Sequence, residues 1–334
     1  MKSWLKIVVP AMFVGVVAAG APGAAHAQAA SIKLDGSSTV FPIAEAVAEE
    51  FQIQKRGKVH VTVGIAGTGG GFKKFCRGET DISDASRPIS KEEMAACAAA
   101  GIKYIELPIA FDALTVVVNP ANTWVKSLTV AQLKKIWEPG AQGRINNWSQ
   151  VAAGFPSEKM MLFGPGTDSG TFDYFTEAVN GKSKASRADY TASEDDNTLV
   201  QGVENNKGGL GYFGFAYYVA HKDKLKAVPI DGGKGPVMPS LENVVNATYQ
   251  PLSRPIFIYV KESAASRPEV QEFIRFFMTS GADLVKEVGY IPLPAAAYQT
   301  ALKHFSDRRL GTVFGGTPKI GITIDQLLSM EAKL

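Results

Sequence analysis

Between residues 31 and 100, short apolar segments alternate with amphipathic ones. The apolar segments are rich in β-branched residues, as strands are, and each is followed by a segment with the spacing of a helix. The expected strands are 31–34, 59–63 and 81–85, and the expected helices are 42–51, 71–76 and 91–100. This alternation predicts βαβ units on a largely parallel sheet, and hence an α/β fold.

A second block of alternating segments occupies the middle of the chain. Two apolar segments, near 108–118 and 252–260, bracket this block and predict two strands that cross between domains and act as a hinge. A chain of 334 residues is also longer than a single core comfortably supports. We therefore expect one lobe from 28–112 and 255–334, with a second lobe, 113–254, inserted into it. Beyond the second crossing, separate helices are expected at 270–278 and 281–288.

The first 27 residues are organised as an export signal. Lys2 and Lys6 give a basic start, an apolar stretch follows at 7–19, and Ala25-His26-Ala27 fits a small-x-small cleavage pattern. We expect a signal peptide over 1–27 that is cleaved near Ala27, which makes the mature protein soluble and exported. An uncleaved anchor is disfavoured because the apolar stretch is short for a membrane span.

Charge and histidine content limit the partners that the chain can bind. The formal net charge is only +3, and no basic run is interleaved with aromatic residues, so we expect no nucleic-acid partner. Any affinity for anions must then be local. The four histidines are scattered without the spacing of a metal site, and neither a metal nor another cofactor is expected.

Cys76 and Cys97 are the two cysteines of the chain. In an exported protein, two thiols this close in sequence favour a disulfide bond between them. The alternative, two buried reduced thiols, stays open because the sequence does not give the distance between their α-carbons.

Three turns rich in glycine and hydroxyl residues carry the candidate chemistry. Each follows an expected strand and precedes an expected helix; they are 36–42, 66–72 and 164–172. A helix N-terminus leaves about four amide donors without intrahelical partners and carries roughly half a positive charge. Glycine lets a ligand approach the backbone, and Ser or Thr adds a further donor. Three such turns predict a site for a small tetrahedral oxyanion.

Taken in order, these turns and the segment Ala85-Ser86-Arg87-Pro88-Ile89 resemble the periplasmic phosphate-binding proteins of the Pst transport system. The likeness runs along most of the chain after residue 35 and includes the glycine- and aromatic-rich segment 208–218. It implies a type II periplasmic binding fold, in which two doubly wound α/β lobes are joined by a two-strand hinge. It also implies a periplasmic protein, not an enzyme, that clamps inorganic phosphate and delivers it to an inner-membrane Pst-type ABC permease. We expect a monomer.

The resemblance also implies a set of phosphate ligands. These are hydroxyl groups and amides of the three turns, together with one further edge of the site. They are Ser38, Thr39 and Val40 from the first turn, Thr68 from the second, Ser169, Gly170 and Thr171 from the third, and Ser86 and Arg87 at the remaining edge.

Two positions depart from the family's pattern. Many members have an arginine four residues before the serine of Ser-Gly-Thr, where this chain has Pro165. An aspartate that accepts the proton of hydrogen phosphate in those members falls at Ser86. Arg87 is expected to replace the lost guanidinium, because its planar fork suits two phosphate oxygens. Asp84, Asp168 or a main-chain carbonyl is expected to accept the proton.

Other roles and functions stay open at this point. Thr39, Thr68 and Ser169 suit helix caps, a role compatible with anion binding, and Arg87 suits a surface ion pair. A phosphate sensor, or a binder of sulfate or molybdate on the same fold, is the alternative function, since a fold does not fix its use. A phosphate-ester hydrolase is less favoured because segment 166–170 has the wrong spacing for a nucleophile elbow.

Overall fold

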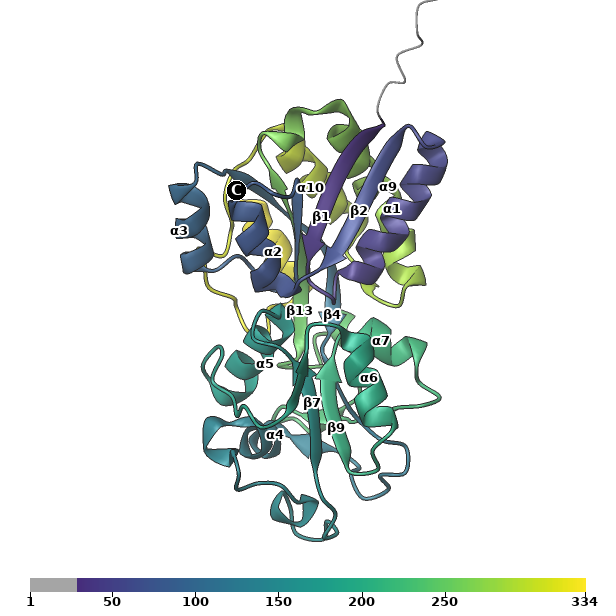
Figure 1. The fold of residues 1–334 in the computed structure, drawn as a ribbon, viewed down its shortest axis with the longest axis vertical. Helices are drawn as coiled ribbons and strands as arrows, with labels where there is room; N and C mark the ends of the chain where they lie inside the picture. Colours follow the sequence, from purple (N-terminus) through teal and green to yellow (C-terminus); the bar gives the residue numbers. More distant parts are fainter. Residues whose placement is uncertain (1–28) are drawn as a thin grey trace, which may run out of the picture.

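The strands and helices gather in two lobes, which lie one above the other in Figure 1. The computed structural model describes residues 29–334, so the expected signal peptide, 1–27, lies outside the described residues. Each lobe is built around its own sheet, and we name the lobes by these sheets: lobe I carries the six-stranded sheet and lobe II the five-stranded one. The architecture is the predicted α/β fold with two lobes.

Lobe I has a mixed sheet flanked by helices. Its strand order is β14 (Ile291–Pro292), β4 (Tyr104–Ala113), β13 (Ser253–Lys261), β3 (Ile82–Ala85), β1 (Ala30–Gly36) and β2 (Val59–Ile65). Strands β1, β2 and β3 pair in parallel, as the βαβ pattern predicts, whereas β13 pairs antiparallel with both β3 and β4. The helices are α1 (Phe41–Lys55), α2 (Gly67–Cys76), α3 (Lys91–Ala99), α9 (Pro268–Glu287), α10 (Ala295–Ser306) and α11 (Ile324–Glu331), with a 3₁₀ turn at Ala264–Ser266.

Lobe II has a five-stranded sheet and a small accessory sheet. The larger sheet runs β10 (Lys226–Ala227), β5 (Thr115–Val118), β9 (Gly209–Phe213), β7 (Met161–Pro165) and β8 (Thr191–Ser193). The smaller one runs β12 (Pro236–Val237), β11 (Ile230–Asp231) and β6 (Leu128–Thr129). The helices are α4 (Val130–Trp137), α5 (Gly170–Asn180), α6 (Asp196–Glu204) and α7 (Phe215–Ala220), with 3₁₀ turns at Pro139–Ala141 and Trp148–Gln150. The short helix α8 (Leu241–Val245) belongs to the same stretch of chain and contacts β4 and β14 of the lobe I sheet.

Strands β4 and β13 lie side by side and lead from one lobe to the other (Figure 1). Both are almost entirely buried, as their apolar segments lead one to expect, although β4 also carries Glu106 and Asp112 and β13 carries Arg254. Their register shifts between Ile256 and Phe257, opposite Pro108, a residue that cannot donate to the ladder. The expected lobe limits at 112 and 255 stay a prediction; Asp112 and Arg254 are direct neighbours in this ladder.

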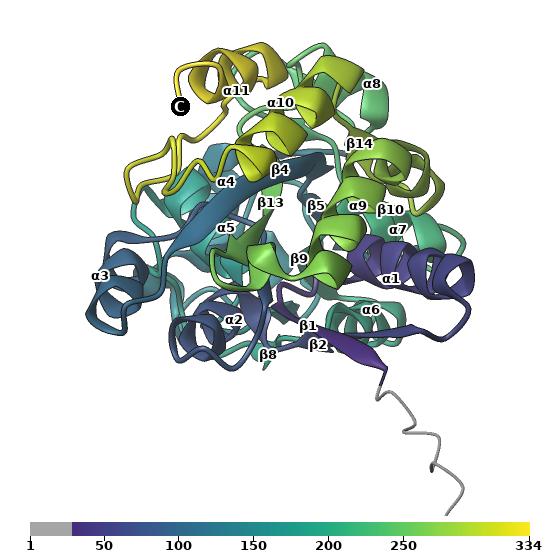
Figure 2. The same cartoon turned by 90° about the horizontal axis from the view of Figure 1, so that it is seen from above.

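Helices cover both flanks of lobe I (Figure 2). Helices α1 and α9 pack side by side through Phe51 and Phe273, whose ring centroids are 5.3 Å apart. The expectation of two helices at 270–278 and 281–288 is wrong, because α9 is continuous from 268 to 287. Gly281 lies inside it and is buried against Phe277, so packing overrides the weak helix propensity of glycine.

No helix among the described residues is long and apolar enough to cross a membrane.

Candidate functional site

Three helices begin where the two lobes meet. The turn before α1 follows β1, α2 follows β2, and Ser86 follows β3, so the parallel strands of lobe I present these segments at one edge of the sheet. Helix α5 follows β7 in lobe II and approaches from the opposite side. The amide of Gly69 in α2 donates to the carbonyl of Asp168, at 2.7 Å, and joins the two lobes directly.

Predicted hydroxyl ligands from both lobes contact one another in this junction. Thr39 Oγ1 of lobe I lies 2.9 Å from Thr171 Oγ1 of lobe II, and Thr68 Oγ1 lies 3.2 Å from Ser86 Oγ. The Ser86 amide donates to Thr68 Oγ1 at 3.1 Å. All four side chains are buried. The structure therefore gathers four of the predicted residues into one polar cluster.

Gly170 packs against this cluster at the start of α5. A Cβ at this position would lie 2.5 Å from Thr68 Oγ1 and 2.7 Å from Ser86 Oγ, closer than real Cβ contacts. Glycine is therefore required for the backbone of α5 to approach the hydroxyl groups of lobe I.

Ser169 is the N-cap of α5, the capping role that the sequence left open. Its Oγ accepts hydrogen bonds from the amides of Thr171 and Phe172, at 3.1 and 3.5 Å. These bonds use the oxygen as an acceptor and leave the hydroxyl proton to donate to a ligand. Capping and ligand binding are compatible at this residue.

Two residues of the first turn use their groups within the protein. The Val40 amide donates to the carbonyl of Ser37 at 3.1 Å, so the donor that was predicted to face the anion is engaged in the turn. Ser38 Oγ donates to Asp196 Oδ1 in lobe II at 3.3 Å, and the Ser38 carbonyl accepts from the Tyr217 hydroxyl at 2.8 Å.

Arg254 supplies the positive charge of the cluster. Its Nη2 donates to Thr171 Oγ1 at 2.7 Å and to Thr39 Oγ1 at 3.4 Å, and its Nη1 donates to the Gly170 carbonyl at 3.2 Å. The side chain is fully buried in β13. Asp112 in β4 compensates its charge, with 2.9 Å between Asp112 Oδ2 and Arg254 Nη2.

Sequence reasoning did not identify Arg254. It is the second residue of β13, and an arginine inside an otherwise apolar crossing is the signal that could have identified it. A buried charge needs a partner, so such a residue points to a structural or ligand-binding role. Its partner Asp112 also accepts from the Phe215 amide of α7, at 3.0 Å.

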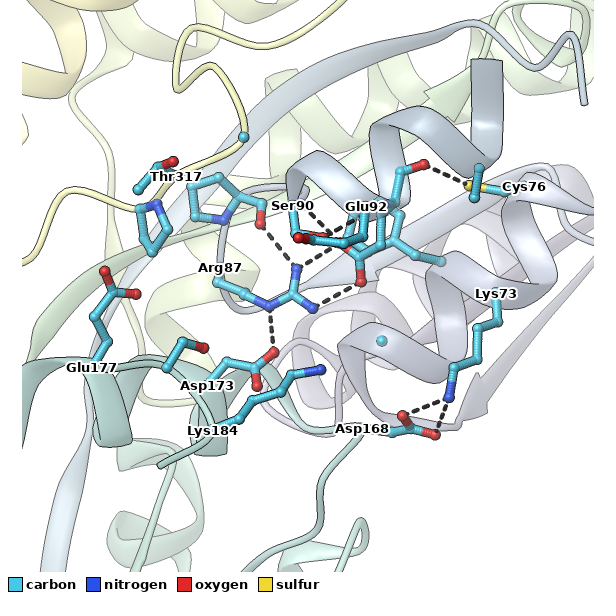
Figure 3. Close-up of a pocket in the computed structure, with 18 residues that line it drawn as sticks. Lys73, Cys76, Arg87, Ser90, Glu92, Asp168, Asp173, Glu177, Lys184 and Thr317 are labelled. Carbon is cyan, nitrogen blue, oxygen red and sulfur yellow. Dashed lines mark hydrogen bonds and ion pairs between the residues drawn. The ribbon is translucent and has the colours of Figure 1, made fainter. Parts of the chain in front are cut away.

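Arg87 lies in a different cluster from the hydroxyl groups. Its guanidinium donates to Glu93, to the Pro88 carbonyl and to Asp173, at distances between 2.7 and 3.0 Å. It lines a cavity of about 610 Å³ between the lobes, as Figure 3 shows. Among the described residues, no hydrogen bond links Arg87 to Thr39, Thr68, Ser86 or Thr171. Its predicted contact with phosphate stays a prediction.

The carboxyl groups near the junction have different surroundings. Asp168 faces the cavity and pairs with Lys73, with 2.7 Å between Oδ1 and Nζ. Asp84 is fully buried and both of its carboxylate oxygens lack a hydrogen-bond partner; burial, with the nearby Asp35, raises its pKa to about 8. Burial also raises the pKa of Asp196 to about 7, and its Oδ2 has no partner.

The predicted disulfide is confirmed. Cys76, at the end of α2, is bonded to Cys97 of α3, which leaves no free cysteine among the described residues. The bridge encloses the segment that carries Ser86 and Arg87.

Comparison with known proteins identifies the class. A model of the PBP superfamily domain matches residues 21–280. The chain is 55% identical over 309 residues to protein SphX of Synechococcus elongatus, which covers 92% of this chain and 90% of that protein. It is 41% identical over 275 residues to phosphate-binding protein PstS of Staphylococcus haemolyticus, covering 81% and 84% of the two chains.

A solved structure supports the same grouping. It is a Clostridium perfringens protein with bound phosphate, described as a candidate phosphate ABC transporter substrate-binding protein. The TM-score is 0.66 at 30% identity, over 79% of this chain and all of that one. The chain belongs to the PstS-like phosphate-binding proteins and has their type II periplasmic binding fold, which confirms the family predicted from the turns. This is a family of substrate-binding proteins, not of enzymes.

Proposed function

We propose that the chain binds one inorganic phosphate between its lobes and delivers it to an ABC permease of the Pst type in the inner membrane. The observation that carries the proposal is the fully buried Arg254, which donates to Thr39 of lobe I and Thr171 of lobe II at once. A cation placed where hydroxyl groups and helix N-termini of two lobes meet suits a small, multiply charged anion.

The ligand set that we propose revises the one from sequence. Thr39, Thr68, Ser86, Ser169, Gly170 and Thr171 keep the roles expected of them, and Arg254 takes the cationic role expected of Arg87. When phosphate enters, the direct contacts Thr39–Thr171 and Thr68–Ser86 are exchanged for contacts with its oxygen atoms. Each charge-assisted hydrogen bond of this kind contributes about 1.5–3 kcal/mol, so half a dozen of them support micromolar or tighter binding after desolvation and closure.

Two crossing strands allow the lobes to separate and to close. Strands β4 and β13 connect them, and direct lobe-to-lobe contacts such as Gly69–Asp168 surround the cluster. Hinge closure around a ligand is a common motion of such two-lobed proteins. We propose that the exported monomer acts in the periplasm in this way.

Phosphate sensing through the same site is the second candidate function, because a relative that is 55% identical to this chain is named SphX and not PstS. Phosphate uptake and starvation signalling, measured in a deletion strain, distinguish the two. Loss of uptake supports delivery to a permease, whereas altered signalling with normal uptake supports sensing.

Isothermal titration of refolded, ligand-free protein tests the binding itself. We expect one phosphate per chain with micromolar or tighter affinity, and much weaker binding of sulfate and molybdate. Equal binding of sulfate, with phosphate no better than millimolar, contradicts the proposal. Turnover of a phosphate ester by the purified protein would favour a hydrolase instead.

A further inference from the structure

Arg87 is held in lobe I by a two-point ion pair. Its Nη1 and Nη2 each donate to one carboxylate oxygen of Glu93, both at 2.8 Å. Glu93 is itself fixed, because its carboxylate accepts from the Ser90 amide in the capping box that begins α3. The guanidinium also lies over the ring of Phe72, 5.9 Å from its centroid. These contacts are all internal to lobe I and do not depend on the position of lobe II.

The remaining edge of the guanidinium faces lobe II. Arg87 Nε donates to Asp173 Oδ2 at 2.7 Å, and both side chains are about 95% buried. Asp173 lies in the first turn of α5, three residues after Gly170 and two after Thr171. The bond therefore ties the segment that carries the lobe II hydroxyls to the lobe I segment that carries Ser86 (Figure 3).

Resting on the proposed function, we infer that Arg87 and Asp173 are positioning residues that hold the two halves of the phosphate site together. They slow the release of phosphate by stabilising the closed arrangement and are not ligands of the anion. Separating the lobes breaks the Nε–Oδ2 bond, while Glu93 continues to compensate Arg87. The bond is thus available only to the closed protein.

The negative charge of Asp173 makes the inference testable, because the possible roles of the Arg87–Asp173 pair predict opposite changes in phosphate affinity when that charge is removed. A carboxylate close to the site repels a bound anion. If electrostatics alone acted, removing the carboxylate of Asp173 would therefore strengthen phosphate binding. If Arg87 were instead a ligand, loss of Asp173 would free its Nε–H for the anion and again strengthen binding. A positioning role predicts instead that Asp173→Asn weakens binding while the protein remains folded.

Glu177 provides a matched control. It lies in α5, four residues after Asp173, and lines the same cavity (Figure 3). Its side chain is only half-buried. Glu177→Gln removes the same charge from the same helix without removing an ion pair to lobe I among the described residues.

The experiment measures phosphate affinity and release rate by titration and stopped flow for the wild type, Asp173→Asn and Glu177→Gln. We expect Asp173→Asn to release phosphate on the order of tenfold faster, with the association rate nearly unchanged, since truncating a buried interface pair acts on dissociation. Glu177→Gln should stay within about twofold of the wild type, because salt screens a partly exposed charge. Melting temperatures check that Asp173→Asn folds, which Glu93 favours by keeping Arg87 paired.

If the wild type binds phosphate and Asp173→Asn binds it as tightly or more tightly, the positioning role is overturned and the proposed function is intact. A slowed association with an unchanged release rate also overturns it. A wild type that binds no phosphate overturns the proposed function, and the positioning role with it.

Discussion

Arg254 and Asp112 form a fully buried ion pair between the two strands that connect the lobes, with 2.9 Å between Nη2 and Oδ2. Asp112 also accepts from Phe215 of lobe II, while Arg254 reaches Thr39 of lobe I. Asp112 thus holds the Arg254 guanidinium at the point where the lobes meet, on the strands that form the hinge.

Replacing Arg254 tests whether this charge binds the anion. Arg254→Ala should cost about 2–5 kcal/mol of phosphate binding, since it removes a buried charge partner. Arg254→Lys should recover only part, because an ammonium group cannot make the forked contact. Titration gives both values, and Arg144→Lys, at an exposed position of lobe II, is the control. Arg254→Lys with wild-type affinity would return the cationic role to another residue.

Asp196 is the carboxyl group whose protonation we expect to affect anion selectivity. Hydrogen phosphate carries a proton that sulfate lacks near neutral pH, so a carboxylate acceptor at the site favours phosphate. Burial raises the pKa of Asp196 to about 7, and Ser38 links it to the first turn. As the pH falls from 8 to 6, Asp196 gains a proton and no longer repels sulfate. We expect wild-type affinity for sulfate to rise over this range and that of Asp196→Asn to stay flat.

Asp84→Asn and Asp168→Asn belong to the same titration series, since the sequence predicted Asp84, Asp168 or a main-chain carbonyl as the acceptor. Sulfate affinity that still rises in Asp196→Asn but is flat in Asp84→Asn would assign the role to Asp84. Full discrimination in all three variants would leave a main-chain carbonyl as the acceptor.

Glu331 in α11 should make the stability of the protein depend on pH. Burial, with the nearby Glu106, raises its pKa from 4.5 to about 8. His304 Nδ1 lies 3.3 Å from Glu331 Oε2, but burial lowers the pKa of this imidazole. The ring therefore does not supply a positive charge that would compensate the carboxylate. Between about pH 4.5 and 8 the folded state binds this proton more tightly than the unfolded state does. The free energy of unfolding therefore falls as the pH rises through this range.

Glu331→Gln removes that dependence. Its melting temperature should exceed that of the wild type by more at pH 9 than at pH 5, as measured by calorimetry. Glu50→Gln, on the exposed face of α1, should show no such difference. An equal effect of Glu331→Gln at both pH values would mean that Glu331 titrates normally.

The disulfide should contribute to the stability of lobe I. Cys76 and Cys97 are 21 residues apart, and the chain-entropy model gives about 3 kcal/mol for a loop of this size. The Cys76→Ser, Cys97→Ser double variant should lose about that much free energy of unfolding in urea. Mass spectrometry of the non-reduced exported protein should find no alkylatable thiol, and two such thiols would contradict the bridge.

The sequence predicted much of lobe I and the hydroxyl part of the site. Periodicity located α1, α2 and α3, and the turns located Thr39, Thr68, Ser169 and Thr171, because both signals are local. It missed the antiparallel strands of the lobe I sheet, because strand direction depends on long-range pairing. It did not identify Arg254, because the partners of this buried arginine lie far away along the chain: Asp112 and Thr39 are 142 and 215 residues distant from it.

A crystal structure of the protein with inorganic phosphate tests the central claim most directly. We expect the anion at the junction of the lobes, with its oxygen atoms within hydrogen-bond distance of Arg254 Nη2, Thr39 Oγ1 and Thr171 Oγ1, and with Arg87 still paired to Asp173. Phosphate bound to Arg87 in the cavity of Figure 3, with no contact to Arg254, would contradict the account.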